Sequence, residues 1–140
     1  MNLLLDTCVI CEIRKAKGSP AVREAVQALP ADSIFVSAIS LGEIAKGMEL
    51  LAAGRKKREI HLWLAEIDRE FDDRIISVDR DTARIWGEIT ARAQKKGIQI
   101  PAVDGLIAAT ALRRGLHVMT RNTRHFAATG ALIIDPWQET

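Results

Sequence analysis

The chain has 140 residues, of which 48% are hydrophobic and 27% are charged, and its formal net charge at pH 7 is +2. This length and composition are those of a globular protein with one core. The small net charge excludes a protein that holds nucleic acid by bulk charge alone, and no apolar run approaches the ~20 residues of a membrane span. We expect a single domain over residues 1–140, located in the cytoplasm because the first residues lack a secretory signal.

Short apolar runs alternate with stretches of helical periodicity along the whole chain. Strands are expected at 3–5, 33–37, 75–78, 117–120 and 132–134, and helices at 7–16, 20–29, 38–54, 55–71, 80–96, 102–114 and 123–128. The expected helix starts are Thr7 as a cap, Ser19 followed by Pro20, Ser37 or Ser40, Asp79 or Asp81, and Pro101.

Strands that alternate with helices predict an α/β domain of three layers, with a mainly parallel sheet of four to five strands and helices on both faces. In such sheets ligands bind at the carboxyl ends of the strands. The first strand, Leu3-Leu4-Leu5, ends at Asp6. We therefore expect the Asp6 carboxylate to face a functional crevice.

Three acids lie in apolar or small-residue surroundings near an expected strand end or helix start: Asp6, Glu43 and Asp104. Each also has a structural interpretation. Asp6 can act as a helix N-cap, and Glu43 follows Ser40 by three residues, which fits a capping box. Asp104 lies in an otherwise apolar segment, where an unpaired charge would cost several kcal/mol, so it requires a partner.

A divalent cation would satisfy all three acids. Carboxylates brought together without a cation raise one another's pKa and destabilise the ionised set. Mg²⁺ prefers oxygen ligands and keeps several waters, and one or two such ions can activate water for attack on phosphorus. Because no nucleophile and base pair accompanies the acids, the pattern indicates metal-assisted phosphodiester hydrolysis.

Other site chemistries have weaker support in the sequence. Cys8 and Cys11 have the spacing of a redox pair, but that function would leave the three acids without a role. A haloacid-dehalogenase-type phosphatase would need a second acid where Cys8 stands. The chain's histidines and cysteines lack the spacing of a zinc site.

Five runs of the sequence carry a family resemblance: Leu3-Leu4-Leu5-Asp6-Thr7, 36–43 (VSAISLGE), 101–111 (PAVDGLIAATA), 118–122 (VMTRN) and 134–137 (IDPW). Together they resemble the PIN-domain ribonucleases, specifically the VapC toxins of bacterial toxin–antitoxin pairs. The resemblance spans nearly the whole chain. It implies a PIN fold, an endoribonuclease that depends on Mg²⁺ or Mn²⁺ and acts on RNA such as tRNA, a homodimer, and inhibition by a small cognate antitoxin.

By position in the family pattern, Asp6, Glu43 and Asp104 would be the metal ligands, and Asn122 would orient a metal-bound water as a further catalytic residue. Thr7 and Thr120 would support the site. Separately, Arg121 follows an expected strand end beside the acids, where it is placed to meet a substrate phosphate.

Two departures from the family pattern affect the expected activity. Cys8 stands where asparagine or serine is usual, and His125 stands where relatives often have an acid, so three carboxylates remain. His125 is open to three interpretations: a surface residue of a short loop, a contact to phosphate, or a participant in general acid–base catalysis. A second function therefore stays open: a PIN-fold module that binds RNA or a protein without cleavage.

The apolar faces of residues 40–71 indicate a partner surface. Met48, Leu51, Trp63 and Leu64 recur there at helical spacing. Exposed apolar patches mark protein interaction sites, so we expect this region to pair subunits or to receive an antitoxin helix.

Overall fold

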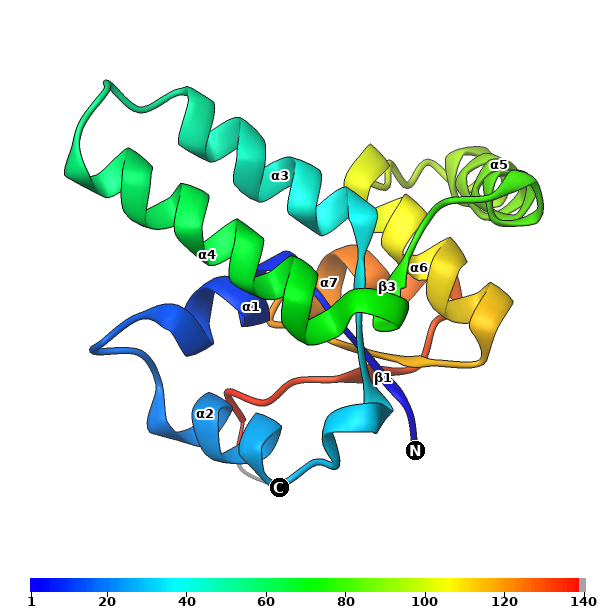
Figure 1. Ribbon diagram of the computed structural model, residues 1–140. Coiled ribbons are helices and arrows are strands. Elements are labelled where there is room, and N and C mark those ends of the chain that lie inside the picture. The colour runs from blue at the N-terminus through cyan, green and yellow to red at the C-terminus, as the bar shows by residue number, and fades with distance from the viewer. Residues whose placement is uncertain (139–140) are drawn as a thin grey trace.

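The computed structural model describes residues 1–138 and contains a five-stranded, fully parallel sheet in the order β3-β2-β1-β4-β5 (Figure 1). The strands are β1 (Leu3–Leu5), β2 (Ile34–Ser37), β3 (Ile75–Ile76), β4 (His117–Met119) and β5 (Ile133–Ile134). The central strand β1 places Leu5 opposite Val36 of β2 and Met119 of β4. Its three leucines are buried, as expected of a strand covered on both faces.

Helices cover both faces of the sheet. They are α1 (Thr7–Arg14), α2 (Pro20–Gln27), α3 (Ala38–Glu49), α4 (Arg55–Phe71), α5 (Arg80–Lys95), α6 (Ala102–Arg114) and α7 (Thr123–Phe126), with 3₁₀ turns η1 (Ala31–Ser33), η2 (Asp72–Arg74) and η3 (Ala127–Thr129). Leu3 and Leu5 pack in one core cluster with residues of α1, α2, α3 and α4, and Leu4 packs in a second with residues of α5 and α6. Alternate residues of β1 thus face opposite layers, and the expected three-layer α/β class is confirmed.

The long helices agree best with the sequence. Both α4 and α6 have the expected bounds, and α6 ends at Gly115, whose positive φ of 68° favours glycine. Ser19 caps α2 with Pro20 in its first turn, as expected. No helix in the part of the chain that the structure describes is long and apolar enough to cross a bilayer.

The expected ends of several elements were wrong. The cap of α1 is Asp6 and not Thr7, because the Asp6 carboxylate accepts from the Thr7 backbone N–H. Helix α3 ends at Glu49, five residues before Gly54. Strand β3 has only two residues, because it pairs with β2 at Ile75 and Ile76 alone before the chain leaves towards α5. The last two residues of the expected domain lie outside the described part.

Candidate active site

Asp6 lies at the carboxyl end of the central strand and is held by hydrogen bonds on both oxygens. Its Oδ1 accepts from the Thr7 backbone N–H at 2.9 Å, and its Oδ2 accepts from the Thr120 hydroxyl at 2.7 Å. The side chain of Asp6 is buried, with 3% of the residue exposed. Parallel pairing of β1 with β4 explains the second bond, since it brings the ends of the two strands to the same edge.

The thiol of Cys8 completes the surroundings of Asp6. Its Sγ lies 3.5 Å from Asp6 Oδ2 and 3.7 Å from the Thr120 hydroxyl. Burial raises the pKa of the Cys8 thiol, so it stays protonated and donates towards Asp6. Cys8 thus supplies a weak donor at this position. Cys8 and Cys11 are both free thiols, so no disulfide within residues 1–138 supports the interpretation as a redox pair.

Asp6 carries an unfavourable charge despite these donors. Burial raises its pKa, and the nearby Asp104 carboxylate raises it further, while the hydrogen bonds from Thr120 and Thr7 act in the opposite direction. The structure therefore brings two of the predicted acids close enough to repel each other.

Glu43 joins the site through Thr7. The Thr7 hydroxyl donates to Glu43 Oε1 at 2.6 Å and lies 2.8 Å from the Ser40 hydroxyl. Ser40 and Glu43 are three apart on α3 and so face α1 together. The capping-box interpretation of Glu43 was wrong, because the N-cap of α3 is Ser37, whose hydroxyl accepts from the Ile39 backbone N–H.

Asp104 lies in the first turn of α6 and contacts His125, a partner that the sequence did not predict. His125 Nδ1 of α7 lies 2.7 Å from Asp104 Oδ2, and Asp104 is 9% exposed. His125 is exposed, as its interpretation as a surface residue has it, but it lies in helix α7 and contacts Asp104. Its sequence signal was weak, since only the family position marked it, and the contact depends on how α7 folds back against α6.

Asn122 and Arg121 follow Thr120 at the end of β4. The Asn122 backbone N–H donates to the Thr120 hydroxyl at 2.9 Å, which ties the segment to the Asp6 network. The Asn122 side chain is exposed and forms no hydrogen bond within residues 1–138. The Arg121 guanidinium lies over the Trp137 ring, 5.2 Å from its centroid.

The donor set suits a hard cation more than a soft one. Asp6 and Asp104 offer carboxylate oxygens in mutual repulsion, which a cation between them would relieve. No three His, Cys, Asp or Glu side chains among the described residues already form a metal-binding group. Mg²⁺ needs only one or two protein carboxylates, because waters and substrate phosphate fill its other positions, so the pair of acids fits this ion.

An apolar groove of about 340 Å³ begins beside Glu43 and runs between α1, α3 and α4. Apolar side chains form much of its lining, and basic side chains stand among them: Thr7, Cys11, Arg14, Lys15, Glu43, Ile44, Gly47, Met48, Leu51, Lys56, Ile60 and Trp63. Met48 is buried, whereas Leu51 and Trp63 are half-buried. The apolar residues expected on 40–71 therefore line a groove next to Glu43.

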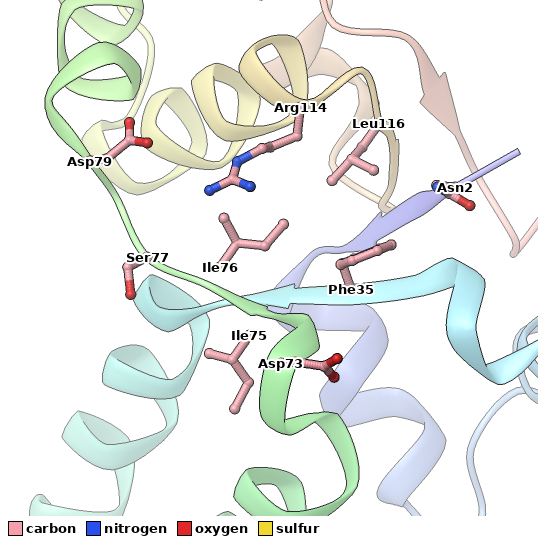
Figure 2. A pocket seen from close by; sticks show the side chains of 9 residues that line it. All are labelled: Asn2, Phe35, Asp73, Ile75, Ile76, Ser77, Asp79, Arg114 and Leu116. Carbon is pink, nitrogen blue, oxygen red and sulfur yellow. The ribbon is translucent and has the colours of Figure 1, made fainter.

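A second cavity, of about 440 Å³, lies between β2, β3 and the C-terminal end of α6 (Figure 2). Figure 2 shows Arg114 reaching into it above Ile76, with Asp79 at its rim. None of the site residues predicted from the sequence lines this cavity. The acids and this cavity are separate features of the molecule.

The fold and site define an α/β protein with buried acids at the carboxyl edge of a parallel sheet. The PIN domain profile matches residues 3–132, so the chain belongs to the PIN-domain family. Toxin FitB of Neisseria gonorrhoeae is 36% identical over 138 residues, 98% of this chain and 99% of FitB. The tRNA(fMet)-specific endonuclease VapC of Shigella flexneri is 34% identical over 140 residues, 98% of each chain.

Solved structures show the same fold. The crystal structure of FitAcB from Neisseria gonorrhoeae matches with a TM-score of 0.92 at 36% identity, over 98% of this chain and 99% of that one. VapBC-5 of Mycobacterium tuberculosis, a member of the VapBC family of toxin–antitoxin systems, matches with a TM-score of 0.66 at 28% identity, over 96% and 98% of the two chains. The resemblance to VapC toxins is thereby confirmed.

Proposed function

We propose that this chain, as a single PIN domain over residues 1–140, is a metal-dependent endoribonuclease toxin that hydrolyses phosphodiester bonds of cellular RNA. The observation that carries the proposal is the buried Asp6 carboxylate next to Asp104. Its burial and the Asp104 charge both raise the pKa of Asp6. Such a strained carboxylate pair is typical of a functional site. Because one relative is named as a tRNA endonuclease, tRNA is the first substrate to test.

Asp6 and Asp104 would hold Mg²⁺ or Mn²⁺ directly, and Glu43, which accepts from the Thr7 hydroxyl, would be the third acidic ligand once its side chain turns towards the ion. When bound, the ion supplies an activated water and stabilises the charge that develops on the phosphate. The protein's own contribution is orientation: Thr120 and Thr7 fix the two oxygens of Asp6, and Thr7 also holds Glu43. Asn122, whose side chain is exposed, would orient a water.

Cleavage of tRNA by the purified chain, freed of any antitoxin, tests the proposal. We expect product with Mg²⁺ or Mn²⁺ and none after chelation. Asp104→Asn should lower the rate by about 100-fold or more, as for loss of one strong electrostatic group at a reaction centre. The matched control is Asp32→Asn, which removes an exposed carboxylate in η1, before β2 begins. Equal loss in both variants would contradict the proposal.

A second function has one observation in its favour. His125 already contacts Asp104 Oδ2, an oxygen that a cation would use, and Asn122 adds no carboxylate. A chain that binds RNA without cutting it would leave tRNA intact with both metals while retarding it in a gel. That result would establish the binding module in place of the nuclease.

The groove between α1, α3 and α4 is the proposed site for the antitoxin. Its apolar floor suits the apolar face of a peptide helix, and Arg14, Lys15 and Lys56 at its lining suit acidic residues of that peptide. Trp63→Ala should weaken co-purification with a protein from an adjacent short reading frame, whereas Trp86→Ala on α5 should not. The mass of the free chain in solution tests the expected homodimer.

A further inference from the structure

The C-terminal segment brings a tryptophan to the edge of the sheet that carries the acids. Strand β5 pairs with β4, and the Thr120 backbone N–H donates to the Ile134 carbonyl at 2.9 Å. Three residues on, the Trp137 backbone N–H donates to Asp135 Oδ1 at 2.9 Å, which fixes the turn after β5. The indole of Trp137 therefore ends beside Arg121, the residue that follows Thr120.

The Trp137 ring is held by packing, whereas the Arg121 side chain that lies over it is exposed. Trp137 is half-buried and packs against the first core cluster, which includes residues of α1 and α2. The backbone on either side of Arg121 is fixed, because the Thr120 N–H donates to the Ile134 carbonyl and the Asn122 N–H donates to the Thr120 hydroxyl, each at 2.9 Å. The long, exposed side chain extends over the indole, which limits the positions that it can take.

Within residues 1–138, the guanidinium N–H groups of Arg121 donate no hydrogen bond, unlike those of Arg74. Arg74 also lies over an aromatic ring, Phe71, but its guanidinium donates to the carbonyls of Ala31, Ile34 and Glu70. Arg121 forms no ion pair in residues 1–138. Glu12, whose pKa the Arg121 charge helps to lower, is bonded instead to the Ser19 backbone N–H and to Lys15.

We propose that Trp137 is a positioning residue, which holds the Arg121 guanidinium at the rim of the acidic site so that Arg121 binds a phosphate of the RNA strand being cut. A guanidinium stacked on an indole keeps its edge N–H groups free, and these match two phosphate oxygens. This inference rests on the proposed nuclease function. It assigns a role to the 134–137 run, which the acids leave unexplained.

Steady-state cleavage tests the positioning first. Trp137→Leu keeps an apolar side chain but removes the aromatic face, and we expect KM to rise about two- to fivefold, the scale of an exposed cation–π contact, with kcat unchanged. Trp137→Phe keeps an aromatic face, so its KM should stay close to that of the unaltered chain. Arg121→Lys keeps the charge but loses the planar stack, so it should match Trp137→Leu even where the tryptophan variant folds poorly.

Binding measurements separate positioning from plain stability. Anisotropy of a labelled single-stranded RNA, measured with the Asp104→Asn chain, gives affinity against salt. Arg121→Gln should lower the slope of log K against log salt by about 0.7, the value for one phosphate contact on a single strand. Adding Trp137→Leu to Arg121→Gln should cause no further loss. Additive losses would overturn the inference, because they would mean that Trp137 acts without Arg121.

The outcomes distinguish this inference from the nuclease proposal. If the unaltered chain cleaves RNA and the two substitutions cause additive losses of RNA affinity, only the positioning role of Trp137 is overturned. If the chain does not cleave RNA but the double variant binds RNA no more weakly than Arg121→Gln, only the nuclease proposal is overturned. No RNA binding by any variant would overturn both.

Discussion

Asp6 and Asp79 form the same local structure and differ in almost everything else. Each follows a strand, caps a helix and accepts from a backbone N–H of the first turn, at 2.9 Å for Asp6 and 2.8 Å for Asp79. Burial raises the pKa of Asp6, and Asp104 adds to this effect, whereas the hydrogen bond from Thr82 lowers the pKa of the exposed Asp79. The capping hydrogen bond is enough to stabilise the ionised form of Asp79, but it does not offset the burial and the Asp104 charge that disfavour the ionised form of Asp6.

The difference shows why a cap does not exclude a catalytic role. An N-cap needs one oxygen of the carboxylate, and Asp79 remains in solvent with nothing more to satisfy. Asp6 uses one oxygen for the cap and presents the other to Thr120 and Cys8, near Asp104. Burial and a like charge, more than the capping bond, make Asp6 the candidate for a functional acid.

Activity should separate the two aspartates most strongly. Asp6→Asn and Asp79→Asn both keep a good N-cap, so both chains should fold. We expect Asp6→Asn to lower metal-dependent RNA cleavage by about 100-fold or more and Asp79→Asn to leave it within error, by initial rates at saturating Mg²⁺. Comparable activity of the two variants would mean that Asp6 is only a cap.

The Thr120 hydroxyl should affect metal affinity. Thr120→Val removes the donor to Asp6 Oδ2 without changing the shape much, whereas Thr120→Ser keeps it. We expect the valine variant to bind Mn²⁺ about 10- to 100-fold more weakly, as for other residues that orient a ligand, and the serine variant to bind nearly normally. Calorimetric titration measures both, and an unchanged valine variant would show that Asp6 needs no such support.

Stability should depend on pH in opposite directions for the two acids. The raised pKa of Asp6 in the folded chain means that its favourable contribution is complete below the unfolded value of about 3.8 and is lost as pH rises through the folded pKa. The metal-free Asp6→Asn chain should therefore gain stability over the unaltered chain from acid to neutral pH. Denaturant unfolding with chelator across this range measures the difference.

The smallest effect is expected for loss of the cap at Asp79. The lowered pKa of Asp79 means that its contribution is present above about pH 3.8 and is lost as pH falls through the folded pKa. Asp79→Ala should lower Tm slightly at neutral pH, more than Asp79→Asn does, and the deficit should shrink in acid. Cleavage at a temperature well below Tm should be unchanged, and a lower rate there would connect Asp79 to the acidic site.

Local patterns were sufficient for the long helices and for the candidate acids. The apolar spacing in 55–71 and the Pro101 and Gly115 boundaries of α6 are contained within each segment, so they predicted the bounds that the structure has. Asp6 and Asp104 were conspicuous because a charge in apolar sequence requires a partner. Short strands such as β3 were less predictable, since their length depends on how many residues of the neighbouring strand they meet.

The sequence by itself determined the α/β class and singled out the candidate acids, because the first depends on periodicity and the second on the cost of charge in apolar surroundings. Only the tertiary structure decided which donors hold those acids: Thr120 on Asp6, Thr7 on Glu43 and His125 on Asp104. These pairs are far apart in the chain. Their geometry is fixed by parallel strand pairing and helix packing, which no local pattern specifies.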